Sequence, residues 1–273
     1  MRHDYYYYNK EQLLAGPKLP LTVMEDNAAV FQAIAQEMVE EIRRKNALGE
    51  KTVFICPVGP VGQYPYFVEL VNAGNISLKN VWFLNMDEYL TDEKEWIAKE
   101  HSLSFRGFMD RTVYTKIAPS LVMPESQRVF PDPKDPENMW RVIQELGGVD
   151  ICFGGIGING HVAFNEAQDE LTPEQFRALP TRVLEISRET RTANAIGDLN
   201  GAVDDMPRWC VTIGMREIYS ARKVRLGCFR DWPRAVARHA AHGEISAHFP
   251  VTLLQEHPDA LLRITEFVAN LPE

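Results

Sequence analysis

Short apolar runs and longer amphipathic segments alternate along this chain of 273 residues. Val30, Ile34, Met38 and Ile42 recur every four residues, which predicts a helix that begins near residue 27, buries one face and ends at Gly49. The apolar runs have the length and the composition of buried strands. They occupy residues 52–56, 81–85, 151–153, 209–213, 222–228 and 261–265.

Helical patterns separate these runs, at residues 63–71, 105–114, 136–146 and 233–241. Strands that alternate with helices, without a linker, predict a single doubly wound, Rossmann-like α/β domain with a mostly parallel sheet and helices on both faces. We expect residues 21–273 to form this domain and residues 1–20 to be an N-terminal extension. Four tyrosines, residues 5–8, are expected to pack over the domain edge or at a subunit contact. The charged segment 167–186 has no strong period and is a candidate mobile lid.

Composition and charge narrow the classes of partner. The net charge of −9 argues against a protein that binds nucleic acid through clustered lysine and arginine. No apolar run approaches the ~18 residues typical of a membrane span, and the first residues lack the apolar core of a signal peptide. The four cysteines are isolated, which favours a reducing compartment. We therefore expect a cytoplasmic protein without a nucleic-acid, membrane or metal partner, because no residues have metal-ligand spacing.

Residues 150–166 carry the densest chemistry. A strand-like run leads into a loop with glycines at 154, 155, 157 and 160. Asn159 lies among these glycines, and His161 and Glu166 follow them. Glycine lets a backbone approach a ligand closely, and histidine is suited to proton transfer near neutral pH. We predict an active site here, with Gly155, Gly157 and Gly160 close to the substrate.

Two other strand ends add candidates, because ligands of open α/β sheets lie beyond the carboxyl ends of the strands. Asp87 and Glu88 follow the run at 81–85, although both would also suit a capping role. The loop 57–62 joins a strand to a helix, and its Gly59 and Gly62 are placed to aim backbone N–H groups at an anion. A plain turn is the alternative.

A dinucleotide site is a weaker alternative for the same stretch. Residues 155–160 fit the pattern G-x-G-x-x-G, and a strand precedes them. An acidic residue should then close the next strand about 20 residues later, but a charged segment fills that interval.

Residues 154–166, together with residues 84–89, resemble the glucosamine-6-phosphate deaminase (isomerase) family, with weaker similarity at 73–77, 190–194 and 254–258. The resemblance implies an aldose–ketose isomerisation of an amino-sugar phosphate with release of ammonia, without cofactor or metal, in a protein that forms homo-oligomers. It matches Asp87 to the carboxylate that moves a proton between C1 and C2. His161 matches the residue that opens the sugar ring, and Glu166 matches its acidic partner.

This chain departs from the family pattern at three places. Asn159 replaces an aspartate two residues before the histidine, and the loop 57–62 is shorter and has no hydroxyl side chain. Ile196 occupies the position of an arginine, whereas Arg234 falls on a lysine that binds the phosphate. The catalytic candidates are thus Asp87, Asn159, His161 and Glu166. The substrate-binding candidates are Gly59, Gly62, Glu88, Gly155, Gly157, Gly160 and Arg234.

Three functions remain open on this basis. The first is a cofactor-free isomerase or deaminase of a sugar phosphate or amino sugar, with an altered phosphate site that leaves the exact substrate open. The second is a sugar lactonase similar to 6-phosphogluconolactonase. The third is a sugar-binding or regulatory homologue with weakened catalysis, for which Asn159 and the altered loop are the motivation.

Overall fold

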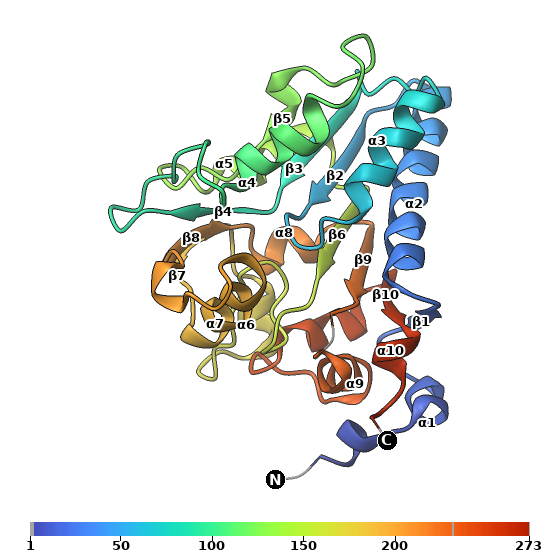
Figure 1. The fold of residues 1–273 in the computed structure, drawn as a ribbon, viewed down its shortest axis with the longest axis vertical. Helices are drawn as coiled ribbons and strands as arrows, with labels where there is room; N and C mark the ends of the chain where they lie inside the picture. The colour runs from blue at the N-terminus through green and yellow to red at the C-terminus, as the bar shows by residue number, and fades with distance from the viewer. Residues whose placement is uncertain (1–2, 231, 273) are drawn as a thin grey trace.

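A seven-stranded sheet in which every neighbouring pair is parallel forms the central layer (Figure 1). The computed structural model describes residues 3–230 and 232–272. The strand order is β1-β10-β9-β6-β2-β3-β5. The strands are β1 (Leu21–Met24), β2 (Thr52–Cys56), β3 (Val81–Asn85), β5 (Arg128–Val129), β6 (Ile151–Gly155), β9 (Lys223–Cys228) and β10 (Ala260–Thr265).

The two faces of this sheet are covered by different helices, because successive side chains of a strand point to opposite sides. On β2, Phe54 and Cys56 pack with α2 (Asn27–Leu48) and α3 (Gln63–Ala73), whereas Val53 and Ile55 join the opposite layer. That layer contains α5 (Asn138–Leu146), α8 (Met215–Tyr219), α9 (Arg234–His242) and η5 (Pro250–Glu256). Both faces are therefore buried, as a parallel sheet requires.

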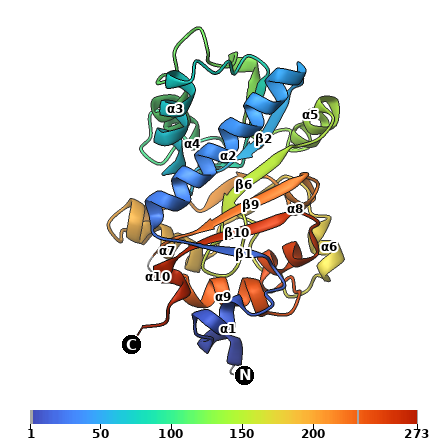
Figure 2. The same cartoon turned by 90° about the vertical axis from the view of Figure 1, so that its right-hand side faces the viewer.

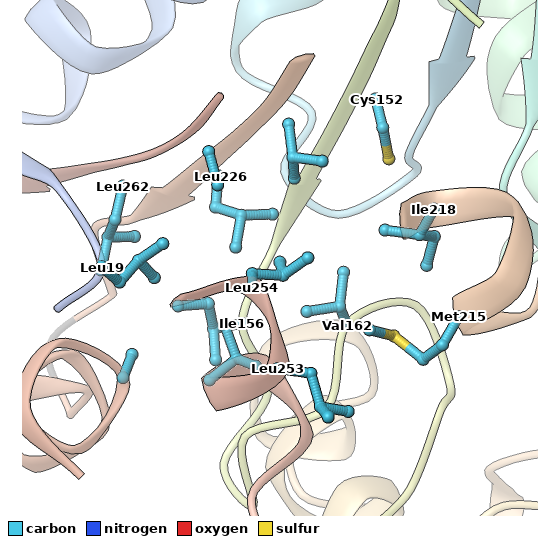
Figure 3. Packing of buried hydrophobic residues seen from close by; sticks show 14 of the residues in the cluster. Leu19, Cys152, Ile156, Val162, Met215, Ile218, Leu226, Leu253, Leu254 and Leu262 are labelled. Atoms are coloured by element: carbon cyan, nitrogen blue, oxygen red, sulfur yellow. The ribbon is translucent and has the colours of Figure 1, made fainter. Parts of the chain in front are cut away.

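Side chains from the second layer meet the sheet directly. Figure 3 shows Leu226 of β9 and Cys152 of β6 beside Leu254 of η5 and Ile218 of α8. All four cysteines are buried with free thiols, so they act as small core side chains.

The direction of the chain reverses at β2 and β6, the neighbouring strands in the middle of the sheet. From β2 the chain proceeds outward through β3 to β5, and it then returns to β6 and proceeds the other way through β9 to β10. Such a switch point opens a crevice at the carboxyl ends of the strands, where ligands of this architecture bind. The loops after β2 and β6 flank that crevice.

A second, antiparallel sheet extends from the first. It has the order β4-β8-β7, with β4 (Asp87–Leu90), β8 (Trp209–Thr212) and β7 (Arg182–Glu185). Figure 1 shows it to one side of the central sheet, next to α7 (Arg188–Asp198) and α6 (Pro173–Arg177). The sequence did not predict this sheet. The remaining elements are η1 (Asp4–Tyr7), α1 (Lys10–Leu14), α4 (Phe105–Met109), η2 (Asp110–Tyr114), η3 (Glu125–Gln127), η4 (Val203–Asp205) and α10 (Glu266–Ala269).

The N-terminal segment packs against α9 (Figure 2). The Tyr6 hydroxyl lies 2.8 Å from His239 Nδ1, and the Tyr8 ring is perpendicular to that of His242. Leu13 and Leu19 are fully buried in the core. The tyrosine run thus packs over one edge of the domain. Among the described residues, no helix combines the length and the apolar character needed to cross a membrane.

Candidate active site

A cavity of about 500 Å³ lies at the carboxyl ends of β2, β3, β6 and β9. Its walls come from the loop 57–62, from residues 155–158 after β6 and from residues 227–230 at the end of β9. Asp87, His161, Thr190, Asn194 and Asp198 also line it. The cavity therefore occupies the switch-point crevice, and two of the four predicted catalytic side chains face it.

Asp87 lies where the chain leaves the central sheet. The neighbouring Met86 accepts a hydrogen bond from Ile213 N (2.8 Å) and donates one to Cys56 O (2.9 Å), which fixes the backbone between the two sheets. The Asp87 carboxyl is 7% exposed and receives no hydrogen bond from the described residues. Burial, and then the charge of Glu88, raise its pKa well above the ordinary value. A desolvated carboxylate of this kind is a stronger base than one in water.

The loop after β6 holds the His161 imidazole against its own backbone. Gly157 N donates to His161 O (2.9 Å), and Gly160, with φ of +80°, donates to Gly157 O (3.0 Å). A Cβ added at Gly157 would lie 2.0 Å from the His161 ring, so the imidazole leaves room only for glycine there. The glycines thus shape the loop around the histidine.

A chain of hydrogen bonds orients this imidazole. Asn159 Nδ2 donates to Glu166 Oε2 (2.5 Å), and Asn159 Oδ1 lies 2.6 Å from His161 Nδ1. A carboxylate only accepts, so the amide oxygen must face the histidine and Nδ1 must carry the proton. Ser187 Oγ also donates to Glu166 Oε2 (3.2 Å). His161 Nε2 then remains available, as an acceptor, to a ligand in the cavity.

The protonation state of His161 follows from its surroundings. Burial lowers its pKa, the carboxylate of Glu166 raises it, and the positive charge of Arg230 lowers it. The net direction is downward, which favours neutral imidazole at physiological pH. Glu166 Oε2 lies 3.7 Å from Nδ1, beyond the amide of Asn159 that joins them. The arrangement places a buried carboxyl group and an imidazole whose Nε2 is an available acceptor at the same cavity.

Glu88 does not line the cavity, contrary to the sequence prediction. It is the next residue to Asp87 on β4, so the two side chains point to opposite faces. Its carboxylate is fully buried and accepts hydrogen bonds from Ser104 Oγ and from the backbone N–H groups of Phe105 and Arg106, each at 2.9 Å. Glu88 therefore anchors the beginning of α4.

Arg234 also lies outside the cavity. Its guanidinium covers the Phe267 ring at 3.8 Å and its Nε donates to Phe267 O (3.0 Å), which directs the side chain toward α10. Arg230, which the sequence analysis did not select, is the cation in the cavity lining of the described chain. Asp198 is near it, because the charge of Arg230 opposes the rise in the pKa of Asp198 that burial causes.

The other predicted positions also fall into two groups, those that line the cavity and those that do not. Gly59, Gly62, Gly155 and Gly157 line the cavity, whereas Gly160 packs behind it against Phe249. No residue from 167 to 186 lines it, and the face that α7 presents carries Thr190, Asn194 and Asp198 instead. Thr190 Oγ1 lies 3.4 Å from His161 Nδ1. Within residues 3–230 and 232–272, no group of His, Cys, Asp and Glu side chains could hold a metal ion.

Curated proteins similar to this chain include glucosamine-6-phosphate deaminases. The one from Caenorhabditis elegans is 31% identical over 252 residues, which cover 91% of this chain and 88% of the relative. The one from Clostridium perfringens (strain ATCC 13124) is 27% identical over 259 residues, which cover 92% and 98%. No family model matches the chain.

Solved structures with the same fold include two kinds of enzyme. A monomeric glucosamine-6-phosphate deaminase superposes with a TM-score of 0.78 at 24% identity, over 92% of this chain and 99% of the other. A 6-phosphogluconolactonase from Trypanosoma cruzi superposes with a TM-score of 0.65 at 17% identity, over 92% and 96%. At these identities the similarity establishes the fold alone. It confirms the predicted α/β class.

Proposed function

The chain belongs to the glucosamine-6-phosphate deaminase family, and from that premise we propose that it converts a 2-amino-2-deoxyaldose and water into a ketose and ammonia. The observation that carries the proposal is the hydrogen-bonded chain from Glu166 through Asn159 to His161, which faces the same cavity as the buried Asp87. The reaction needs a carboxylate base and a neutral-pH proton carrier, and the cavity offers both.

Ring opening comes first in the proposed sequence. His161 Nε2 takes the proton of the C1 hydroxyl and returns it to the ring oxygen as the bond between C1 and that oxygen breaks, which gives an open-chain aldehyde. The imidazole is briefly protonated, and Asn159 Oδ1 accepts from Nδ1–H throughout. Glu166 stabilises the positive charge from 3.7 Å.

Isomerisation and release of ammonia follow. The carboxylate of Asp87 removes the proton from C2 and delivers it to C1, while the ammonium group on C2 gives one proton to the aldehyde oxygen. This leaves a hydroxyl at C1 and a protonated imine at C2. Water adds to that imine, the C2–N bond breaks, and a ketose and ammonia leave. Burial supports this role, because it raises the pKa of the Asp87 carboxyl and with it the strength of the base.

Asn159 weighs against the reading in which catalysis is lost. An asparagine carries no charge, but its two-sided amide passes the orienting effect of the Glu166 carboxylate to the imidazole. The lactonase reading has the support of fold similarity alone. Assembly into homo-oligomers, cytoplasmic location and the mobility of residues 167–186 stay predictions.

Ammonia release and ketose formation from a panel of 2-amino-2-deoxyaldoses test the proposal. We expect Asp87→Asn and His161→Ala to lower kcat by about 10²–10⁴, the usual contribution of acid–base groups. Asp169→Asn and His248→Ala are matched controls, because those two exposed side chains pair with each other outside the cavity lining. Acidification from sugar lactones without ammonia release, or parental rates in the two active-site variants, would contradict the assignment.

A further inference from the structure

The loop between β2 and α3 offers little to an anion. Two of its six positions, Pro57 and Pro60, have no backbone N–H, and Val58 and Val61 present branched apolar side chains without a hydroxyl group. Anion sites usually rely on several charge-assisted hydrogen bonds from side chains and free amides. This wall of the cavity has the surface of an apolar subsite.

An aromatic ring packs beside the N-terminal end of α3. Gly62 precedes the first residue of α3, and a Cβ added to it would lie 2.3 Å from the Phe31 ring. Phe31 also packs edge-to-face against Phe229, with centroids 4.7 Å apart. Both rings line the cavity. Two phenyl rings therefore form apolar cavity surface beside the residue that precedes α3.

The charges in the lining also disfavour a phosphate. Among the described lining residues, Arg230 is the cation, whereas Asp87 and Asp198 are carboxylic acids. A phosphate ester carries about two negative charges at neutral pH. Arg230 supplies a single positive charge, so binding of the ester would leave negative charge uncompensated in the cavity.

Exposed apolar side chains ring the mouth of the cavity. Val61, Ile158 and Trp232 line it and are 37%, 38% and 36% exposed. The apolar character of the loop 57–62 thus continues outward to the mouth.

We propose that the substrate is an unphosphorylated 2-amino-2-deoxyaldose whose terminal carbon carries an uncharged, apolar group that packs against Phe31, Val58, Val61 and Trp232. The inference rests on the proposed function for the reacting end of the sugar. It adds the chemical class of the other end, which the loop 57–62 selects. A 6-deoxy sugar and a 6-O-acyl sugar both have the required character.

Kinetics with sugars that differ only at C6 test this inference. Ammonia release is measured with 2-amino-2,6-dideoxyglucose, 6-O-acetylglucosamine, glucosamine and glucosamine 6-phosphate. We expect kcat/KM to be higher by about tenfold or more for the first two than for the phosphate ester, since one unfavourable charge contact of about 1.4 kcal/mol gives a factor of ten. A higher kcat/KM for glucosamine 6-phosphate overturns the inference.

A pair of lysine substitutions adds a direct test of the wall. Val61→Lys places a cation at the mouth, and Leu48→Lys makes the same change at an exposed position (60%) at the far end of α2, about 25 Å along the helix from Phe31. We expect Val61→Lys to raise the kcat/KM ratio of phosphate ester to 6-deoxy sugar at least severalfold, and Leu48→Lys to leave that ratio unchanged. Equal ratios in the two variants contradict the assigned subsite.

Binding to a catalytically impaired protein separates this inference from the proposed function. Calorimetry with Asp87→Asn compares the affinities of the 6-deoxy and the 6-phosphate sugars without turnover. Tighter binding of the uncharged sugar supports the inference even when no sugar releases ammonia from the parental protein, which would refute the proposed function alone. Tighter binding of the phosphate ester, or no binding of an uncharged sugar, overturns the inference. If the parental protein nevertheless releases ammonia from an amino sugar, the proposed function stands.

Discussion

The loops after β6 and β2 face the same cavity from neighbouring strands but differ in chemistry. The loop after β6 holds His161 between a glycine backbone and the Asn159–Glu166 pair, and its polar groups are joined by short hydrogen bonds. The loop after β2 presents prolines and valines, under the ring of Phe31. One wall of the cavity carries titratable groups joined by hydrogen bonds, and the other presents apolar surface.

This difference separates chemistry from selection. A mutation in the β6 loop acts on groups that exchange protons, so it should lower kcat, whereas a mutation in the β2 loop acts on binding and should change KM. Substrate range can therefore change at one strand end while the reaction is preserved at the next.

Removing the amide that joins His161 to Glu166 should have the largest effect. Asn159→Leu is close to isosteric but leaves Nδ1–H without an acceptor and Glu166 without its 2.5 Å donor. We expect kcat to fall by about 10²–10⁴, the range for loss of a catalytic acid–base group, with little change in KM. Asn138→Leu, at the first residue of α5 and outside the cavity lining, is the control. Parental kcat in Asn159→Leu would remove the relay from the mechanism.

Glu166→Gln should have a smaller effect on the same loop. The amide keeps an acceptor for Asn159 and Ser187 but loses the charge that lies 3.7 Å from His161 Nδ1. Loss of such a supporting carboxylate costs about 10–100-fold in activity. The pKa of His161 should also fall, because Glu166 raises it, and a pH profile of kcat/KM would record that shift. Glu185→Gln, at an exposed pair with Arg208, is the matched control.

The hydrophobic pattern was sufficient to predict most of the central sheet but not the second one. Strands such as β2 and β6 are continuous apolar runs, because both of their faces are buried. β4 begins with Asp87 and Glu88, which resemble a capping pair rather than a strand, and it is only four residues long. Its partners β7 and β8 follow about a hundred residues later. Their pairing with β4 depends on tertiary contacts, which the local pattern of apolar and polar residues cannot predict.

The same distinction between local sequence patterns and tertiary contacts applies to the candidate site. The motif around His161 is local in sequence, so Asn159, His161 and Glu166 could be placed together without a structure. The sequence alone could not show that Arg230, and not Arg234, lines the cavity. Only the structure shows that the Arg234 side chain packs on Phe267. Phe31 comes from a helix that precedes β2, and only the structure brings its ring over Gly62.

Asp87→Asn should make the protein more stable as it removes activity. The unfolded carboxyl has a pKa of about 3.9, and burial raises the folded value well above that. The folded chain therefore holds a proton that the unfolded chain has lost, so the parental free energy of unfolding falls as pH rises from the unfolded pKa to the folded one. The side-chain amide of the variant does not titrate. We expect the variant to gain stability relative to the parent across that window, as measured by denaturant unfolding at several pH values.

A constant stability difference between Asp87→Asn and the parent from pH 4 to pH 8 would contradict this account. Asp169→Asn again serves as the control, since that carboxylate is 76% exposed. Its difference from the parent should stay small at every pH in the series.

Asn159→Asp should have a more modest effect. Aspartate keeps an acceptor for His161 Nδ1 at about the same place, but it puts a second carboxylate beside Glu166, in place of the Nδ2 donor. An adjacent negative charge raises the pKa of imidazole, so the limb of the pH profile that belongs to His161 should move to higher pH. At pH 7.5 we expect kcat to change by less than about tenfold, because tautomer control is kept. An unchanged profile would mean that residue 159 does not act on His161.

Val58→Thr should have the smallest effect and provides the clearest contrast between the two loops. The side chain is half-buried in the cavity wall, so a hydroxyl there weakens an apolar contact without touching the groups that move protons. We expect KM for 2-amino-2,6-dideoxyglucose to rise about two- to fivefold, which corresponds to less than about 1 kcal/mol of lost apolar contact, and kcat to stay at the parental value. A substitution in the β6 loop should show the reverse, with kcat lowered and KM kept. If Val58→Thr lowers kcat as Glu166→Gln does, the β2 loop takes part in the chemistry and the division between the two walls fails.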